Sequence, residues 1–229
     1  MFGAAPVLNS APQLNASAVS WKLPAPALAA ALVMLPVFVQ APWVRSSPVA
    51  CTLFTAVLVA LGLRLRGSHG ALLVGFAGSW LAGAIFWGWL RLHPLWHLPV
   101  EAFALPLALA GLQGPWRRAG QFYLGALIGT ACTDAATALC GLMPLWPQVL
   151  QASPSDAPLL LSAAAEQVLQ PLPLLVIGGF AAAMVAAGRW LWLKGDGGRV
   201  VAASLLSTLA VDALFLALAL LSPQLSGLV

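Results

Sequence analysis

Charged side chains are scarce in this chain. Of its 229 residues only 7% are Asp, Glu, Lys or Arg, whereas 61% are apolar. About a quarter of the residues in a soluble domain are charged, so an ordinary soluble protein is excluded. The same scarcity of charge excludes a disordered segment and, despite a net charge of +4, a protein that binds nucleic acid. The composition predicts a polytopic membrane protein.

The chain also lacks the short motifs of several well-known sites. Its three cysteines form no C-x-x-C pair, which argues against a disulfide framework and a zinc ribbon. No H-E-x-x-H, G-x-S-x-G or phosphate-binding glycine loop occurs, so zinc proteases, serine hydrolases and nucleotide-binding proteins have no support. No aspartate carries the G-x-G-D signature of intramembrane aspartyl proteases.

Long apolar stretches are abundant. A helix needs roughly 20 apolar residues to cross the hydrocarbon core of a bilayer, and cutting the sequence where charges, Pro and Gly cluster yields seven such stretches. We therefore predict an all-α fold, a membrane bundle of about seven transmembrane helices. These helices are expected at residues 24–42, 48–64, 70–90, 98–113, 120–146, 171–193 and 200–221.

Lys and Arg residues are unevenly divided between the two sides that seven helices define. Only Arg45 and Arg91 fall on the side away from the N-terminus. Because cytoplasmic loops retain positive charge, we expect the N-terminus in the cytoplasm and the C-terminus on the opposite side. The basic residues on the expected cytoplasmic side are Lys22, Arg64, Arg66, Arg117, Arg118, Arg189, Lys194 and Arg199.

Two regions lie outside these helices. Residues 1–20, rich in Ala, Pro, Ser and Asn, are expected to form a loose tail, and residues 21–229 a single transmembrane domain. The stretch 159–170 is too short to cross the membrane before Pro171 and carries Glu166 near its middle. It is expected to form a short interfacial or re-entrant helix, or else an extension of the span that follows.

Two aspartates lie deep in the fifth and seventh predicted helices. An aspartate at the centre of a membrane helix costs roughly 2.5 to 3.5 kcal/mol on insertion scales, which makes Asp134 and Asp212 candidates for function. Both helices are expected to run outward from the cytoplasmic side, so the two carboxyl groups should share a depth.

Hydroxyl side chains extend each aspartate into a polar ridge. Thr130 lies four residues before Asp134, and Ser204 and Thr208 precede Asp212 at the same spacing, which keeps each ridge on one helix face. If the two ridges meet, they enclose a hydrated cavity of the kind that lines proton relays and cation or amine sites. Alternatively, each aspartate is neutral or bonds its own Thr or Ser and only locks the packing.

A second polar cluster is expected on the outer side. His93, His97 and Glu101 recur at four-residue intervals, a spacing that would align metal ligands on a continuous helix. Pro94 and Pro99 interrupt that continuity. Either Pro99 starts the fourth span with Glu101 in its first turn, or the cluster forms a site for a metal, a pigment or a substrate.

The central part of the chain resembles a known family. The block HPLWHLPVEAFALPLALAGL and the stretch FYLGALIGTACTDAATALCGLMPLWPQVLQA are similar to integral membrane proteins of unknown function found in cyanobacteria. The resemblance covers roughly residues 70–150. It implies a photosynthetic host, and hence the plasma membrane or the thylakoid, and it assigns no catalytic residue.

Three functions stay open on this basis. The first is a permease-like protein whose aspartates handle a proton, a cation or a cationic small solute. The second is a non-catalytic factor that assembles or stabilises a photosynthetic or respiratory membrane complex, and the third is a membrane enzyme that acts on a lipid or a quinone. The lipid bilayer is an expected partner in each case and nucleic acid is not; the residues identify neither a cofactor nor a metal.

Overall fold

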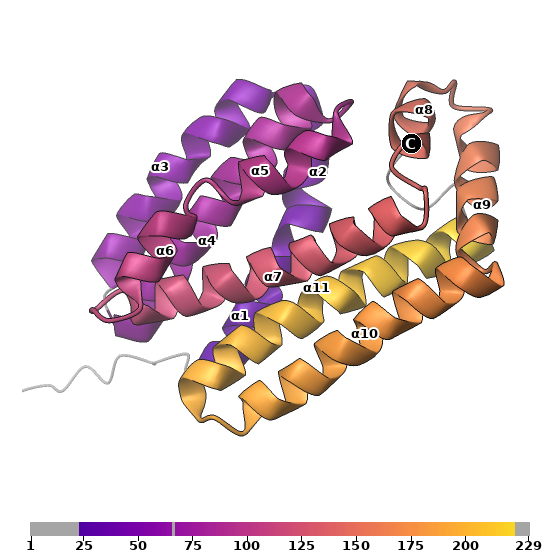
Figure 1. The fold of residues 1–229 in the computed structure, drawn as a ribbon. Helices are drawn as coiled ribbons and strands as arrows, with labels where there is room; N and C mark the ends of the chain where they lie inside the picture. Colours follow the sequence, from indigo (N-terminus) through magenta and orange to yellow (C-terminus); the bar gives the residue numbers. More distant parts are fainter. Residues whose placement is uncertain (1–22, 66, 223–229) are drawn as a thin grey trace, which may run out of the picture.

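The computed structural model describes residues 23–65 and 67–222, which form helices and turns without a β-strand (Figure 1). The predicted tail, residues 1–20, lies outside the described residues. In chain order the helices are α1 (Ala25–Leu35), α2 (Ala41–Ser46), α3 (Pro48–Leu65), α4 (Gly67–Ile85), α5 (His97–Glu101), α6 (Leu105–Gly111), α7 (Arg117–Leu139), α8 (Leu145–Gln151), α9 (Ala157–Val168), α10 (Pro171–Trp192) and α11 (Asp196–Leu221). Two π-helical segments, Pro36–Gln40 and Phe86–Leu90, join α1 to α2 and extend α4.

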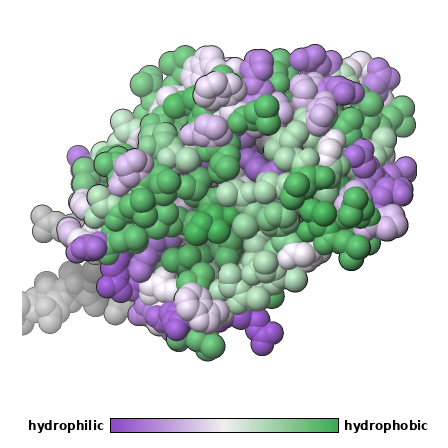
Figure 2. Space-filling model, in the orientation of Figure 1, coloured by the Kyte–Doolittle hydropathy of each residue, from purple (hydrophilic) through white to green (hydrophobic). Residues whose placement is uncertain are grey.

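Six helical stretches among the described residues are long and apolar enough to cross a membrane. They are Ala25–Ser46, Pro48–Leu65, Gly67–Leu90, Arg117–Leu139, Pro171–Trp192 and Asp196–Leu221. The predicted all-α helical bundle is thus confirmed, and its apolar helices indicate a multi-pass membrane protein in contact with the bilayer. Figure 2 shows hydrophobic residues across the middle of one face of the molecule and hydrophilic residues gathered toward its two ends.

The fourth expected span differs from the prediction of one continuous helix. Residues 98–113 contain α5, a turn over residues 102–104, and α6. Pro99 lies inside α5 and does not start a longer helix, while Pro106 is one of the first residues of α6. Because proline supplies no backbone N–H, two prolines seven residues apart weaken a continuous helix at this point.

The interrupted segment nevertheless runs alongside α7. Ala108 lies against Gly120 near the start of α7, whereas His97 reaches Asp134 near its end. The hydroxyl of Tyr123, the single tyrosine of the chain, donates to the Glu101 carbonyl and accepts a hydrogen bond from the backbone N–H of Ala104. These bonds satisfy backbone groups at the break, as the interior of a membrane requires.

As a result, α4 and α7 run in the same direction, with residues 97–111 returning between them. Gly75 in the middle of α4 packs on Ala119 near the start of α7. Beyond the other ends, the Trp146 indole N–H donates to the Arg91 carbonyl at 2.9 Å. In the seven-span prediction the third and fifth spans also run in the same direction, and residues 97–111 would then make the fourth pass as two short helices.

The fifth expected span, residues 120–146, is also shorter than predicted. Helix α7 ends at Leu139, and Gly141 follows with a φ of +69°, a left-handed conformation that favours glycine. The chain then forms α8 and α9, which stand at one end of the bundle (Figure 1). Helix α9 corresponds to the short helix expected at 159–170, and its Glu166 is exposed.

Candidate functional site

The two aspartates are brought to one level by the packing of α7 on α11. A Cβ atom placed on Gly125 would lie 2.7 Å from the Val201 carbonyl oxygen, and one on Gly129 would lie 2.7 Å from the Thr208 hydroxyl. The two helices therefore run in parallel register, and Asp134 and Asp212 lie about one turn further along. The Thr133 side chain of α7 lies close to the Asp212 carboxyl group.

Asp134 forms an ion pair with His97. The His97 Nδ1 atom lies 3.0 Å from both carboxylate oxygens, and the side chains of His97 and Asp134 are only 17% and 13% exposed. Because an ionised carboxylate can only accept hydrogen bonds, the Nδ1–H group is the donor to Asp134. The pair joins the start of α5 to the last part of α7.

Aromatic rings shield His97 from the surroundings. Its imidazole lies 4.5 Å from the ring of Phe86 and 5.9 Å from that of Trp146, measured between ring centroids. Phe86 is fully buried and belongs to the π-helical segment that extends α4. Such an enclosure removes water and strengthens the electrostatic interaction between His97 and Asp134.

Glu101 and Asp212 complete a cluster of four ionisable groups. The charges of His97, Glu101 and Asp134 act on one another, and Asp212 interacts with both His97 and Asp134. The Oδ2 atom of Asp212 is buried and has no hydrogen-bond partner among the described residues. A buried carboxyl oxygen without a partner is costly, so this atom is available to a proton, a water molecule or a solute.

A cavity of about 160 Å³ lies beside the cluster. Its polar lining comes from five helical segments, which supply Gln40, Ser79, Glu101, Thr130 and Thr208. The remaining wall is apolar. A polar cavity of this size can hold several water molecules or a small solute, and Glu101 places a member of the ionisable cluster directly in its wall.

The predicted site residues on α7 and α11 occupy three different kinds of position. Thr130 and Thr208 line the cavity, and Asp134 and Asp212 lie one helical turn beyond them. Ser204, by contrast, is fully buried between α7 and α11, against Gly125, and donates to the Val200 carbonyl. The two polar clusters that the sequence analysis treated separately are one site, since His97 bonds Asp134.

His93 does not join this site. It is exposed in the turn before Pro94, so His93, His97 and Glu101 do not align on one helix face. Among the residues that the structure describes, no group of three His, Cys, Asp or Glu side chains is placed to hold a metal ion. The structure thus gives no support to the metal-site interpretation of this triplet.

Gln40 and Ser79 are site residues that the sequence analysis missed. Gln40 is 2% exposed, and its amide donates to the Trp80 carbonyl. It belongs to the π-helical segment Pro36–Gln40, a type of segment that is frequent at functional sites. A signal was present, because Gln40 is a polar residue in an otherwise apolar stretch between Pro36 and Pro42.

A comparison with family models matches residues 29–220 to DUF3120, described as a protein of unknown function. The chain belongs to this family. The match extends well beyond the expected residues 70–150 and takes in every residue that lines the cavity or belongs to the ionisable cluster. Comparisons with curated proteins and with solved structures find no match.

Proposed function

We propose that this DUF3120 protein is a permease that moves a proton or a small cation through the cluster of His97, Glu101, Asp134 and Asp212. The observation that carries the proposal is the His97–Asp134 ion pair beside a polar cavity in a bundle of apolar helices. Ionisable groups inside membrane spans are costly, and they commonly line proton relays and ion pathways. Here the four groups converge from three helices.

Each residue has a distinct role in the proposal. Glu101 faces the cavity and exchanges a proton or cation with its contents. His97 links Glu101 to Asp134, while Asp212, with its unpartnered oxygen, is the second proton acceptor. Thr130 and Thr208 supply hydroxyl groups to the cavity wall, and Ser204 holds Thr208 in place by accepting its hydrogen bond through the backbone carbonyl.

The interrupted helices favour transport over a purely structural role. Secondary transporters commonly place their sites where membrane helices are discontinuous, because the break exposes backbone groups and leaves room for a substrate. In this chain the cavity is lined by residues of both π-helical segments and of α5. The ion pair and the cavity carry the proposal, and the interrupted helices add a likeness to the architecture of such transporters.

The test is proton flux into vesicles that contain the purified protein and the pH-sensitive dye pyranine. A potassium gradient with valinomycin supplies the driving potential. Asp134→Asn and Asp212→Asn should each slow the flux about a hundredfold, as expected for loss of a positioned proton-transfer group. Asp196→Asn, which removes an exposed aspartate at the start of α11, is the matched control. A double variant of Asp134 and Asp212 with the wild-type rate contradicts the proposal.

We also propose that the N-terminus is cytoplasmic and that the C-terminus lies on the opposite side of the membrane. The distribution of Lys and Arg supports this orientation. Alkaline phosphatase inserted at Ser155, in the turn between α8 and α9, should be active because the enzyme folds only outside the cytoplasm. The same enzyme inserted at Gly195, between α10 and α11, should be inactive. The reverse pattern of activity contradicts the orientation.

A further inference from the structure

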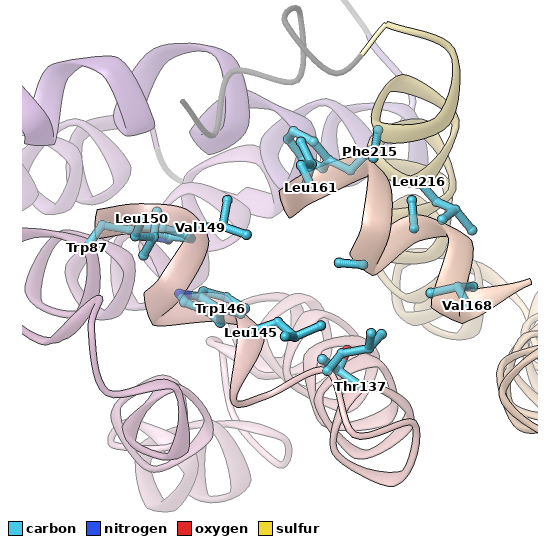
Figure 3. A pocket seen from close by; sticks show the side chains of 14 residues that line it. Trp87, Thr137, Leu145, Trp146, Val149, Leu150, Leu161, Val168, Phe215 and Leu216 are labelled. Carbon is cyan, nitrogen blue, oxygen red and sulfur yellow. The ribbon is translucent and has the colours of Figure 1, made fainter. Parts of the chain in front are cut away.

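A second pocket, which is apolar, adjoins Trp87 as the polar cavity does. Its volume is about 260 Å³, and it is enclosed by α8, α9 and the last turns of α7 and α11. Trp87 lines both spaces. Figure 3 shows side chains from these helices arranged around the open space, among them Trp146, Leu161 and Phe215.

The wall of this pocket is poorly suited to a polar ligand. Thr137 carries the single hydroxyl group in the lining, and that hydroxyl already donates to the Thr133 carbonyl at 2.8 Å. The Trp146 N–H is likewise used by the Arg91 carbonyl. The rings of Trp87 and Trp146 are stacked with centroids 5.6 Å apart. An apolar ligand would therefore lose no hydrogen bond on entering.

The volume and the surroundings narrow the choice of ligand. Sites for whole small molecules commonly measure roughly 300 to 1,000 Å³, so a pocket of about 260 Å³ fits a slender segment better than a ring system. An empty apolar space forfeits dispersion contacts. In a bundle surrounded by lipid, the hydrocarbon chain of a bilayer lipid is the apolar molecule at hand.

Arg91 adds a charge at the same end of the bundle. It is exposed, its carbonyl is bonded by the pocket residue Trp146, and it forms no ion pair with any described residue. Arginine pairs well with phosphate, since its planar guanidinium presents several N–H donors. We propose that the pocket holds an acyl chain of an anionic phospholipid whose phosphate group pairs with Arg91.

The proposal is tested by native mass spectrometry of the full chain in detergent with added phosphatidylglycerol or phosphatidylcholine. The wild type should retain one phosphatidylglycerol. Ala164→Phe, which fills the pocket lined by Ala164, should weaken this retention at least about tenfold, whereas Ala163→Phe, at the exposed neighbouring position, should not. Ala164→Val serves as a milder filling variant with an intermediate loss. Arg91→Gln should remove the preference for phosphatidylglycerol over phosphatidylcholine.

Two results would overturn this proposal. The first is equal retention by Ala164→Phe and Ala163→Phe when both variants keep wild-type helix content by circular dichroism. The second is a gain in lipid retention when residues 223–229 are deleted, because that result would identify the C-terminal segment as the occupant of the pocket. Neither result bears on proton flux, which is measured separately.

Discussion

Two of the neighbours of α7, helix α11 and residues 97–111, are built in opposite ways. Helix α11 is unbroken from Asp196 to Leu221 and approaches α7 so closely that glycine is needed at positions 125 and 129. Residues 97–111 instead form two short helices joined by a turn. The ionisable cluster lies where these two neighbours meet on α7, with Asp212 supplied by one and His97 and Glu101 by the other.

Helix α11 and residues 97–111 contribute to the site in different ways. Close contact between α7 and α11 fixes the relative depth of Asp134 and Asp212, because sliding either helix would bring a residue with a side chain to the contacts that Gly125 and Gly129 now make. The interrupted neighbour supplies room for a cavity and a histidine for the ion pair. The substitutions below disturb the contact of α7 with one of these two neighbours and leave its contact with the other unchanged.

Removing the histidine of the ion pair is expected to have the largest effect on the stability of the protein. His97→Ala leaves the mostly buried Asp134 carboxylate without its partner and should lower the free energy of unfolding by about 3 kcal/mol. Equilibrium unfolding in SDS, followed by circular dichroism, measures this change. His93→Ala removes an exposed histidine from the same segment and should change the free energy by less than about 0.5 kcal/mol.

A second substitution distinguishes loss of the ion pair from loss of packing. In the double variant of His97→Ala with Asp134→Asn, the unpaired group is a neutral amide, so much of the stability should return. If the effects of the two single substitutions simply add, then His97 stabilises the protein by contact with Phe86 and Trp146 and not by its charge.

The α7–α11 half of the site could be predicted from the sequence because it depends on helical periodicity. Asp134 and Asp212 were expected at a common depth, with Thr130 and Thr208 four residues before them, and both threonines line the cavity. Continuous apolar helices keep their register over many residues, so spacing along the chain translates into position.

The other half could not be predicted, since it depends on where a helix breaks. Treated as one span, residues 98–113 leave His97 on the outer surface, far from Asp134. The break allows α5 to approach α7, and its position is fixed by tertiary contacts with Tyr123. Gln40 was missed for the same reason, because a π-helical segment changes which face of the helix a residue occupies.

A larger residue at position 125 tests how closely α7 must pack on the unbroken helix α11. Gly125→Ala places a methyl group against the Val201 carbonyl and the Ser204 side chain, and such overpacking should cost about 2 kcal/mol of unfolding free energy. Gly178→Ala is the control, because nothing lies within 4 Å of that position on α10. The same SDS titration compares them. Equal stability of the two variants would show that α11 moves away from α7 without penalty.

The smallest expected effect concerns the break between α5 and α6. Tyr123→Phe keeps the buried ring but removes the hydroxyl that bonds Glu101 and Ala104, leaving a carbonyl and an N–H without these partners. Hydrogen bonds inside membrane bundles contribute little on average, so the expected loss is about 1 kcal/mol. Ser46→Ala removes an exposed hydroxyl bonded to the Trp43 carbonyl and should have almost no effect. If Tyr123→Phe matched Ser46→Ala in the SDS titration, the two prolines alone would account for the break, and the tyrosine would contribute only its ring to the packing on α4.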